Sequence, residues 1–66
     1  MSNYGAKIKR LREEKEMSQE QLAKEIEVAV STVGMWERCE RSPRDDVKKK
    51  IADFFGKSVQ FIFFDD

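Results

Sequence analysis

Two short amphipathic segments stand almost end to end in this chain, and their closeness strongly constrains the fold. The first begins with a capping-box pattern, in which Gln21 follows Ser18 by three residues, and it predicts a helix over about residues 19–26. The second, "VAVSTVGMWER", predicts a helix over residues 28–38. Two short helices joined by about three residues cannot lie antiparallel, so we expect them to cross steeply. One of them then lies on the outside of the domain, free to enter a groove.

Three further segments have a hydrophobic period near 3.6 residues, which is typical of helices. "GAKIKRLREEKE" predicts a helix over about residues 5–15, and "RDDVKKKIADFFGKS" predicts one that ends before Gly56, where a left-handed residue is expected. Ser58 can cap a last short helix over about residues 58–64. No segment alternates as a strand does. We therefore expect an all-α fold, a compact five-helix bundle in a single domain over residues 1–66.

The apolar positions of these helices predict the core. They are Ile8, Leu11, Leu22, Ala23, Ile26, Val33, Trp36, Val47, Ile51, Phe54 and Phe55. In the last segment Val59, Ile62 and Phe63 share one face by spacing, which leaves Phe61 and Phe64 without an intramolecular place. Exposed aromatic pairs usually mark an interface, so Phe61 and Phe64 predict a symmetric homodimer. The alternative is that the tail folds back over a thin core.

Composition excludes several classes of function. Thirteen Lys and Arg balance thirteen Asp and Glu, so a nucleic-acid partner has to be argued from local arrangement and not from net charge. The chain has no His, which removes the commonest general base, and one Cys without His gives no nitrogen–sulfur metal cluster. Its three glycines are isolated, so no phosphate-cradling loop is visible. We expect no catalytic residue, no metal and no cofactor.

Targeting signals are also missing from the sequence. There is no apolar run of membrane-spanning length, and "MSNYGAKIKR" lacks the apolar stretch of a signal peptide. The single Cys39 cannot form an internal disulfide. These features predict a cytoplasmic protein with no membrane partner.

The segment 28–38 has an unusual outer face. Val33 and Trp36 are three residues apart and are expected to face the core. The residues that face away are Val30, Ser31, Gly34, Met35 and Arg38. A helix normally points charged or amide groups at water, whereas this face is mostly small and apolar, which indicates a binding surface.

The stretch "IKRLREEKEMSQEQLAKEIEVAVSTVGMWERCERSP" resembles the helix-turn-helix domain of the lambda-repressor/Cro-like (XRE) transcription regulators. The motifs "RLREEK", "SQEQLA", "STV" and "WER" carry the resemblance, which continues through "KIADFFGKSVQFIFF" and covers about residues 6–64. It implies that the third helix lies in the major groove of DNA. It also implies that the base-reading residues are Ala29, Val30, Ser31, Gly34 and Met35.

The resemblance assigns other residues to the DNA backbone. Gln19 matches a family glutamine that holds the backbone, and Arg38, Arg41, Ser42 and Arg44 flank the third helix and its following loop, with Arg10 as a possible addition. Each of these cations alone can also be ordinary solvated surface. Arg12 and Glu37 match a family ion pair that orients the third helix; the alternative is two unrelated surface charges.

The sequence departs from the family pattern at three places. Glu27 stands where a turn glycine is usual, and Cys39 where glycine usually follows "WER"; a left-handed backbone there costs about 1 kcal/mol each. Ala29 stands where Ser or Thr usually caps the third helix, which costs about another 1 kcal/mol.

The function implied is that of a sequence-specific double-stranded DNA-binding transcriptional regulator, a repressor or operon controller that acts as a homodimer on a palindromic operator. A chain of this length leaves no room for a sensing domain, so regulation is expected to act through expression level or a regulatory protein partner. Val30 and Met35 would bury against thymine methyl groups, and Gly34 would let the helix backbone approach the base edges. The alternative is an antitoxin- or anti-repressor-like protein-interaction module on the same scaffold, favoured by the apolar face and the neutral net charge.

Overall fold

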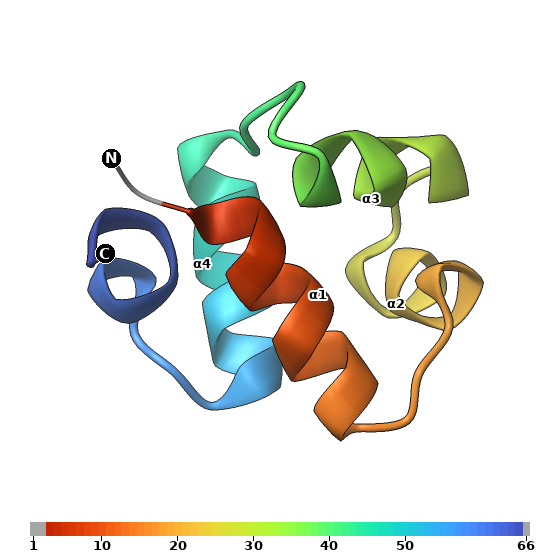
Figure 1. Ribbon diagram of the computed structural model, residues 1–66, viewed down its shortest axis with the longest axis horizontal. Helices are drawn as coiled ribbons and strands as arrows, with labels where there is room; N and C mark the ends of the chain where they lie inside the picture. The colour runs from red at the N-terminus through yellow and green to blue at the C-terminus, as the bar shows by residue number, and fades with distance from the viewer. Residues whose placement is uncertain (1–2, 66) are drawn as a thin grey trace.

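The computed structural model describes residues 3–65, and every regular element in that range is a helix. The bounds are α1 Tyr4–Glu14, α2 Gln19–Ile26, α3 Val30–Glu37, α4 Asp45–Phe55 and a short final helix, η1, Gln60–Phe64. Figure 1 shows α1 and α4 in the middle, with α2 and α3 on one side and the blue η1 on the other. The expected all-α architecture of five helices is confirmed.

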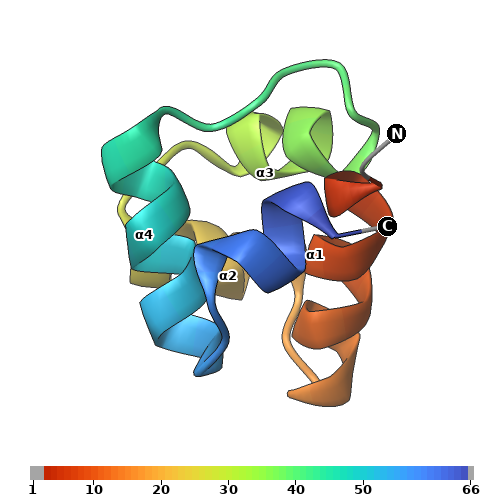
Figure 2. The same cartoon turned by 90° about the vertical axis from the view of Figure 1, so that its left-hand side faces the viewer.

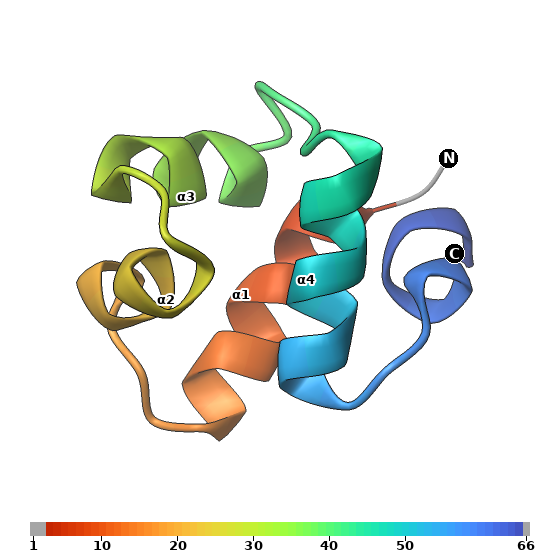
Figure 3. The same ribbon diagram turned by 180° about the vertical axis from the view of Figure 1, so that it is seen from behind.

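The helices α2 and α3 cross steeply. In Figure 1 α2 is seen nearly end-on while α3 is seen along its length, and the view from behind in Figure 3 shows the same relation. Figure 2 shows η1 on the opposite side of the molecule, between α4 and α1. The outer side of α3 is therefore free of η1.

The core lies between the five helices and follows the predicted apolar periodicity. Its members are Ile8, Leu11, Leu22, Ala23, Ile26, Val33, Trp36, Ile51, Ala52, Phe55, Ile62 and Phe63. Val47 and Phe54, which the spacing also assigned to the core, are only partly buried and pack against its edge. Trp36 is 2% exposed, so the inner face of α3 is anchored by the largest side chain of the chain.

A reciprocal capping box fixes the start of α2. The Ser18 hydroxyl accepts a hydrogen bond from the Gln21 backbone N–H at 3.1 Å, and the Gln21 side-chain oxygen accepts one from the Ser18 N–H at 2.7 Å. Two backbone donors that a helix start leaves without partners are thereby satisfied. The predicted bounds of α2 agree with the structure.

Each of the four α-helices is followed closely by a residue with positive φ. Gly56 (φ 67°) follows α4, but the other three are Glu16 (55°), Glu27 (68°) and Cys39 (58°). After α3, the Cys39 N–H donates to the Trp36 carbonyl at 3.0 Å and the Glu40 N–H donates to the Met35 carbonyl at 2.9 Å. This pattern is a Schellman motif, which satisfies the last carbonyls but strains a residue other than glycine.

The third helix begins later than its apolar spacing predicts. We expected residues 28–38, whereas α3 starts at Val30. Glu27 is left-handed and Ala29 is extended (φ −70°, ψ 148°), so the turn takes residues that the pattern assigned to the helix. Ala29 forms no side-chain cap.

The final helix differs from the expected α-helical geometry. Its turn is wide, and the Asp65 N–H donates to the Gln60 carbonyl at 2.9 Å, five residues back. The Ser58 hydroxyl accepts from the Phe61 N–H at 3.0 Å, as a capping residue does. The Lys7 ammonium donates to the Phe61 carbonyl at 2.8 Å and ties the segment to α1.

Candidate functional site

The outer side of α3 borders a shallow hollow of about 450 Å³. It is lined by Gln19, Val30, Ser31, Gly34, Met35, Arg38 and Glu40, and we refer to these residues as the α3 surface. Val30 is 44% exposed although it is apolar, and Ser31 is exposed beside it. Ala29 is also exposed, at the N-cap of α3. The structure thus brings four of the five expected base-reading residues into one hollow, with Ala29 at the adjoining end of the helix.

Gly34 does not present the open backbone that we expected. It is buried, and a methyl group built on it lies 3.1 Å from Nη1 of Arg38. Arg38 follows Gly34 by four residues, so its side chain reaches back over the same face of the helix. The guanidinium of Arg38 occupies the space above Gly34, and the helix backbone there is not bare.

Arg38 is held in that position by Glu40. Nε of Arg38 donates to Oε2 of Glu40 at 2.9 Å, and Nη2 donates to Oε1 at 3.2 Å. The hydrogen bond from Arg38 and its positive charge lower the pKa of Glu40, so this carboxyl is ionised at neutral pH. Both side chains are more than half exposed, and Glu40 uses two of the five guanidinium N–H groups of Arg38.

A buried network lies beneath one end of the α3 surface. Glu37, the last residue of α3, accepts hydrogen bonds from Nε of Arg12 at 2.7 Å, from Nη2 of Arg12 at 3.0 Å and from Nε2 of Gln19 at 3.0 Å. Arg12 also donates from Nη1 to the Met17 carbonyl at 2.7 Å. One carboxylate therefore joins α1, α2 and α3, and the amide of Gln19 is oriented by it.

Burial and hydrogen bonding shift the pKa of Glu37 in opposite directions. Burial raises its pKa, but the hydrogen bonds from Arg12 and Gln19 and the charges of Arg12 and Lys9 outweigh it, so the pKa lies below its ordinary value. The pKa of Arg12 is raised, mainly by its hydrogen bond to Glu37. The pair is fully ionised near neutral pH.

A second hollow, of about 250 Å³, lies between α3 and the start of α4. It is lined by Val28, Thr32, Trp36, Arg41, Ser42, Pro43, Arg44 and Val47. The expected backbone contacts Arg41, Ser42 and Arg44 are thus grouped beside the N-terminal half of α3. Nε of Arg44 lies 4.0 Å from Oδ1 of Asp46, and both side chains are largely exposed. Asp46 therefore constrains the Arg44 guanidinium only weakly.

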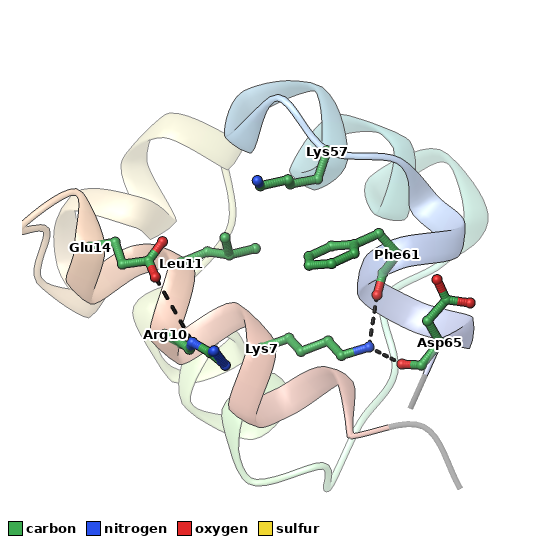
Figure 4. A pocket seen from close by; sticks show the side chains of 7 residues that line it. All are labelled: Lys7, Arg10, Leu11, Glu14, Lys57, Phe61 and Asp65. Atoms are coloured by element: carbon green, nitrogen blue, oxygen red, sulfur yellow. Dashed lines mark hydrogen bonds and ion pairs between the residues drawn. The ribbon is translucent and has the colours of Figure 1, made fainter.

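Arg10 is not part of this grouping. It lines a third hollow of about 540 Å³ between α1 and η1, with Lys7, Leu11, Glu14, Lys57, Phe61 and Asp65 (Figure 4). Its guanidinium lies 3.9 Å from Glu14. The resemblance suggested Arg10 as a DNA contact, but this hollow shares no residue with the α3 surface. The side chain of Arg10 therefore extends from a face of α1 that points toward η1 and does not border the α3 surface.

Sequence reasoning missed three residues of the site. Glu40 lies on the α3 surface, Thr32 lines the second hollow, and Lys9 is a second α1 cation, besides Arg12, whose charge lowers the pKa of Glu37. The helical period marked Thr32 neither as core nor as outer face. Glu40 could not be predicted from the helical period, because it lies beyond the end of α3 and is brought back toward Arg38 by the left-handed turn at Cys39.

The residues that the structure describes form neither a cluster of metal-ligating side chains nor a membrane-spanning helix. Within residues 3–65, His, Cys, Asp and Glu side chains form no group of three that is able to hold a metal ion. None of the helices in this range has the length and apolar character needed to cross a bilayer.

A steeply crossed α2–α3 pair with an accessible outer α3 surface defines the site as a helix-turn-helix. A family model described as helix-turn-helix matches residues 8–62. The chain belongs to this helix-turn-helix family, of the lambda-repressor-like (XRE) type, whose members are DNA-binding transcriptional regulators.

A solved structure has the same fold. The P22 c2 repressor protein, crystallised in complex with synthetic operator 9T in the presence of Tl⁺, superposes with a TM-score of 0.92, 21% sequence identity and full coverage of both chains. No curated protein sequence matches this chain. The comparison with the P22 c2 repressor establishes the arrangement of the five helices.

Proposed function

We propose that this protein is a sequence-specific regulator that binds double-stranded DNA with the α3 surface in the major groove, and that it represses transcription or controls its own operon. The observation that supports this most is that the exposed apolar side chain of Val30 lies beside a hollow lined by Arg41 and Arg44. Apolar side chains read base edges where a thymine methyl is present, and cations hold the phosphates on either side.

The proposed base contacts come from the N-terminal half of α3 and the residue before it. Val30 and Met35 bury against thymine C5-methyl groups, since both lie on the α3 surface and Met adapts its shape readily. Ser31 supplies one hydrogen bond to a base edge, and Ala29 approaches the groove at the helix N-terminus.

The proposed phosphate contacts lie on both sides of α3. Arg41, Ser42 and Arg44 contact one strand from the second hollow. Gln19 contacts the other at the start of α2, where free backbone N–H groups favour phosphate oxygens. Lys9 is the candidate cation on α1 in place of Arg10, because it is exposed and its charge lowers the pKa of Glu37, which orients Gln19.

The regulator is proposed to act as a homodimer through η1. Phe61 and Phe64 are 43% and 58% exposed, and η1 lies on the far side of the domain from α3. A two-fold axis there places one α3 in each half-site of a palindromic operator. We propose a regulatory protein partner as a further means of control, since residues 3–65 are taken up by the helix-turn-helix fold.

Selection from random duplexes tests the proposal. Bound DNA is enriched and sequenced, and the affinity for the enriched site is then titrated at two salt concentrations. The three cations among these contacts, Arg41, Arg44 and Lys9, give a log–log slope of roughly −3 per chain despite zero net charge. Arg41→Ala and Arg44→Ala weaken binding to enriched and random duplexes alike, whereas Glu14→Gln, on another face, has no such effect.

The outcome that contradicts the proposal is also specific. If no duplex is enriched and a protein is captured instead through Val30 and Met35, the α3 surface is a protein-binding face on the same scaffold. A salt slope near zero with the enriched duplex rules out the phosphate contacts.

A further inference from the structure

In the Arg38–Glu40 ion pair, the carboxylate binds one edge of the guanidinium and leaves another edge without a partner in the pair. Glu40 occupies the Nε and Nη2 donors of Arg38, at 2.9 and 3.2 Å, which together form one edge of the guanidinium. The second edge, formed by Nη1 and Nη2, keeps one free N–H on each nitrogen. Two donors along one edge match O6 and N7 of guanine, which is the commonest specific contact in the major groove.

The pair lies on the α3 surface and not beside it. Arg38 and Glu40 line the same hollow as Val30, Ser31 and Met35. Nη1, which belongs to the unoccupied edge, is the Arg38 atom nearest to a methyl group built on Gly34, at 3.1 Å. A methyl group at Gly34 would press on the guanidinium and displace it by a few tenths of an ångström.

Backbone geometry places Glu40 where it can hold Arg38. Cys39 has a φ of 58°, and the Glu40 N–H donates to the Met35 carbonyl at 2.9 Å. The chain therefore turns back on the end of α3 and brings the carboxylate alongside Arg38. Because both side chains are more than half exposed, the pair contributes little to folding.

From these three observations we infer that Arg38 is a guanine reader, that Glu40 is the positioning residue that presents its free edge, and that Gly34 lets the guanidinium lie close against α3. This inference rests on the proposed function. It assigns Arg38 to base reading, in place of the phosphate contact that the family resemblance implies. It also adds a guanine to a half-site in which Val30 and Met35 favour thymine.

The test uses three duplexes and four variants of the full chain. The duplexes are the enriched operator, the same operator with 7-deazaguanine in place of one guanine at a time, and a random sequence. The variants are Arg38→Lys, Glu40→Gln, Gly34→Ala and the control Glu14→Gln, which removes an equivalent charge from the exposed Arg10–Glu14 pair. Ala favours helix over Gly, so Gly34→Ala keeps the fold.

We expect 7-deazaguanine at one position of each half-site to weaken wild-type binding about tenfold, because it removes the N7 acceptor of a bidentate contact. Arg38→Lys keeps its affinity for random DNA and shows a smaller penalty, since Lys carries the charge but lacks the planar fork that binds O6 and N7 together. Glu40→Gln and Gly34→Ala reduce the penalty at the same position. Glu14→Gln retains it in full.

Three results overturn the inference while leaving the proposed function intact. They are an enriched site in which no guanine is sensitive to the substitution, an Arg38→Lys variant that keeps the penalty in full, and a Glu40→Gln variant that strengthens binding to operator and random DNA equally. The last result makes Glu40 a competitor of DNA for Arg38. If the wild-type chain enriches no duplex, the proposed function fails and this inference fails with it.

Discussion

Arg12 of α1 and Glu37 of α3 meet at two points, with Nε 2.7 Å from Oε2 and Nη2 3.0 Å from Oε1. Their side chains are only 10% and 5% exposed. Since Glu37 is the last residue of α3, this pair fixes the end of the helix against α1. The neighbouring contacts, from Gln19 to Glu37 and from Arg12 to the Met17 carbonyl, leave neither group isolated.

The first prediction is that this pair is strongly coupled. Arg12→Met and Glu37→Leu each lower the free energy of unfolding by about 3 kcal/mol, because each leaves one nearly buried charge without its partner. The double variant costs clearly less than the sum of the two. Urea unfolding of the four proteins gives the coupling, and the exposed Lys49–Asp53 pair provides a control cycle with little coupling. Additive effects at Arg12 and Glu37 would show that the two charges do not interact.

The second prediction concerns acid stability. The folded-state pKa of Glu37 is lowered, so its contribution is complete above the ordinary glutamate pKa of about 4.3. It is lost as the pH falls from there through the lower folded-state value. We expect the unfolding free energy of the wild type to fall over this window and that of Glu37→Gln to fall less steeply. Identical slopes for the two proteins would mean that Glu37 has the same pKa folded and unfolded.

The third prediction concerns the left-handed residues after the helices. Glu16→Gly raises the free energy of unfolding by up to about 1 kcal/mol, because glycine adopts a φ of 55° without strain. Gly56→Ala is the matched reverse change. A methyl group there meets no atom within 4 Å, so its cost of about 1 kcal/mol is backbone strain alone. Thermal unfolding measures both, and a destabilised Glu16→Gly variant would contradict the assigned conformation.

These strained positions show where the sequence was informative and where it was not. The capping box at Ser18 and Gln21 and the core spacing of Val33 and Trp36 predicted α2 and the inner face of α3, because both patterns are local. At the positions of Glu27 and Cys39 the family usually has glycine, which indicated where a positive φ could occur. Nothing in the local sequence indicated the same conformation at Glu16.

Of the α3 surface, the sequence predicted the residues that follow from the helical period and missed the positions that depend on the turn after α3. Val30, Ser31 and Met35 follow from the helical period once Trp36 is placed in the core. The position of Arg38 over Gly34 and the return of Glu40 depend on a turn geometry that the period does not encode. The wide turn of η1 was likewise not predictable, because Ile62 and Phe63 fit an α-helical spacing equally well.

The fourth prediction is that the chain forms a dimer through η1. Lysine ammonium groups lie over both exposed rings, with Lys7 5.4 Å from the centre of Phe61 and Lys48 5.2 Å from that of Phe64. These contacts leave much of each ring accessible. Sedimentation equilibrium is expected to give twice the chain mass at micromolar concentration.

Two substitutions locate that interface. Replacing Phe61 and Phe64 together by Ser gives a monomer with unchanged helical content, while Val30→Ser, on the opposite side, remains dimeric. A wild type that is monomeric both alone and when bound to its operator would show that η1 only covers the core.

The central claim is that the outer surface of α3 lies against base edges in the major groove, and thymine-to-uracil replacement tests it most directly. Uracil lacks only the C5-methyl group, which lies in that groove. The dissociation constants of wild type, Val30→Ala and Met35→Ala are measured on the enriched operator with uracil at one thymine at a time. Our account predicts weaker wild-type binding at two or more positions of each half-site, and at each of these positions one variant no longer distinguishes thymine from uracil. Equal affinity of the wild type for the thymine and uracil operators at every position would contradict it.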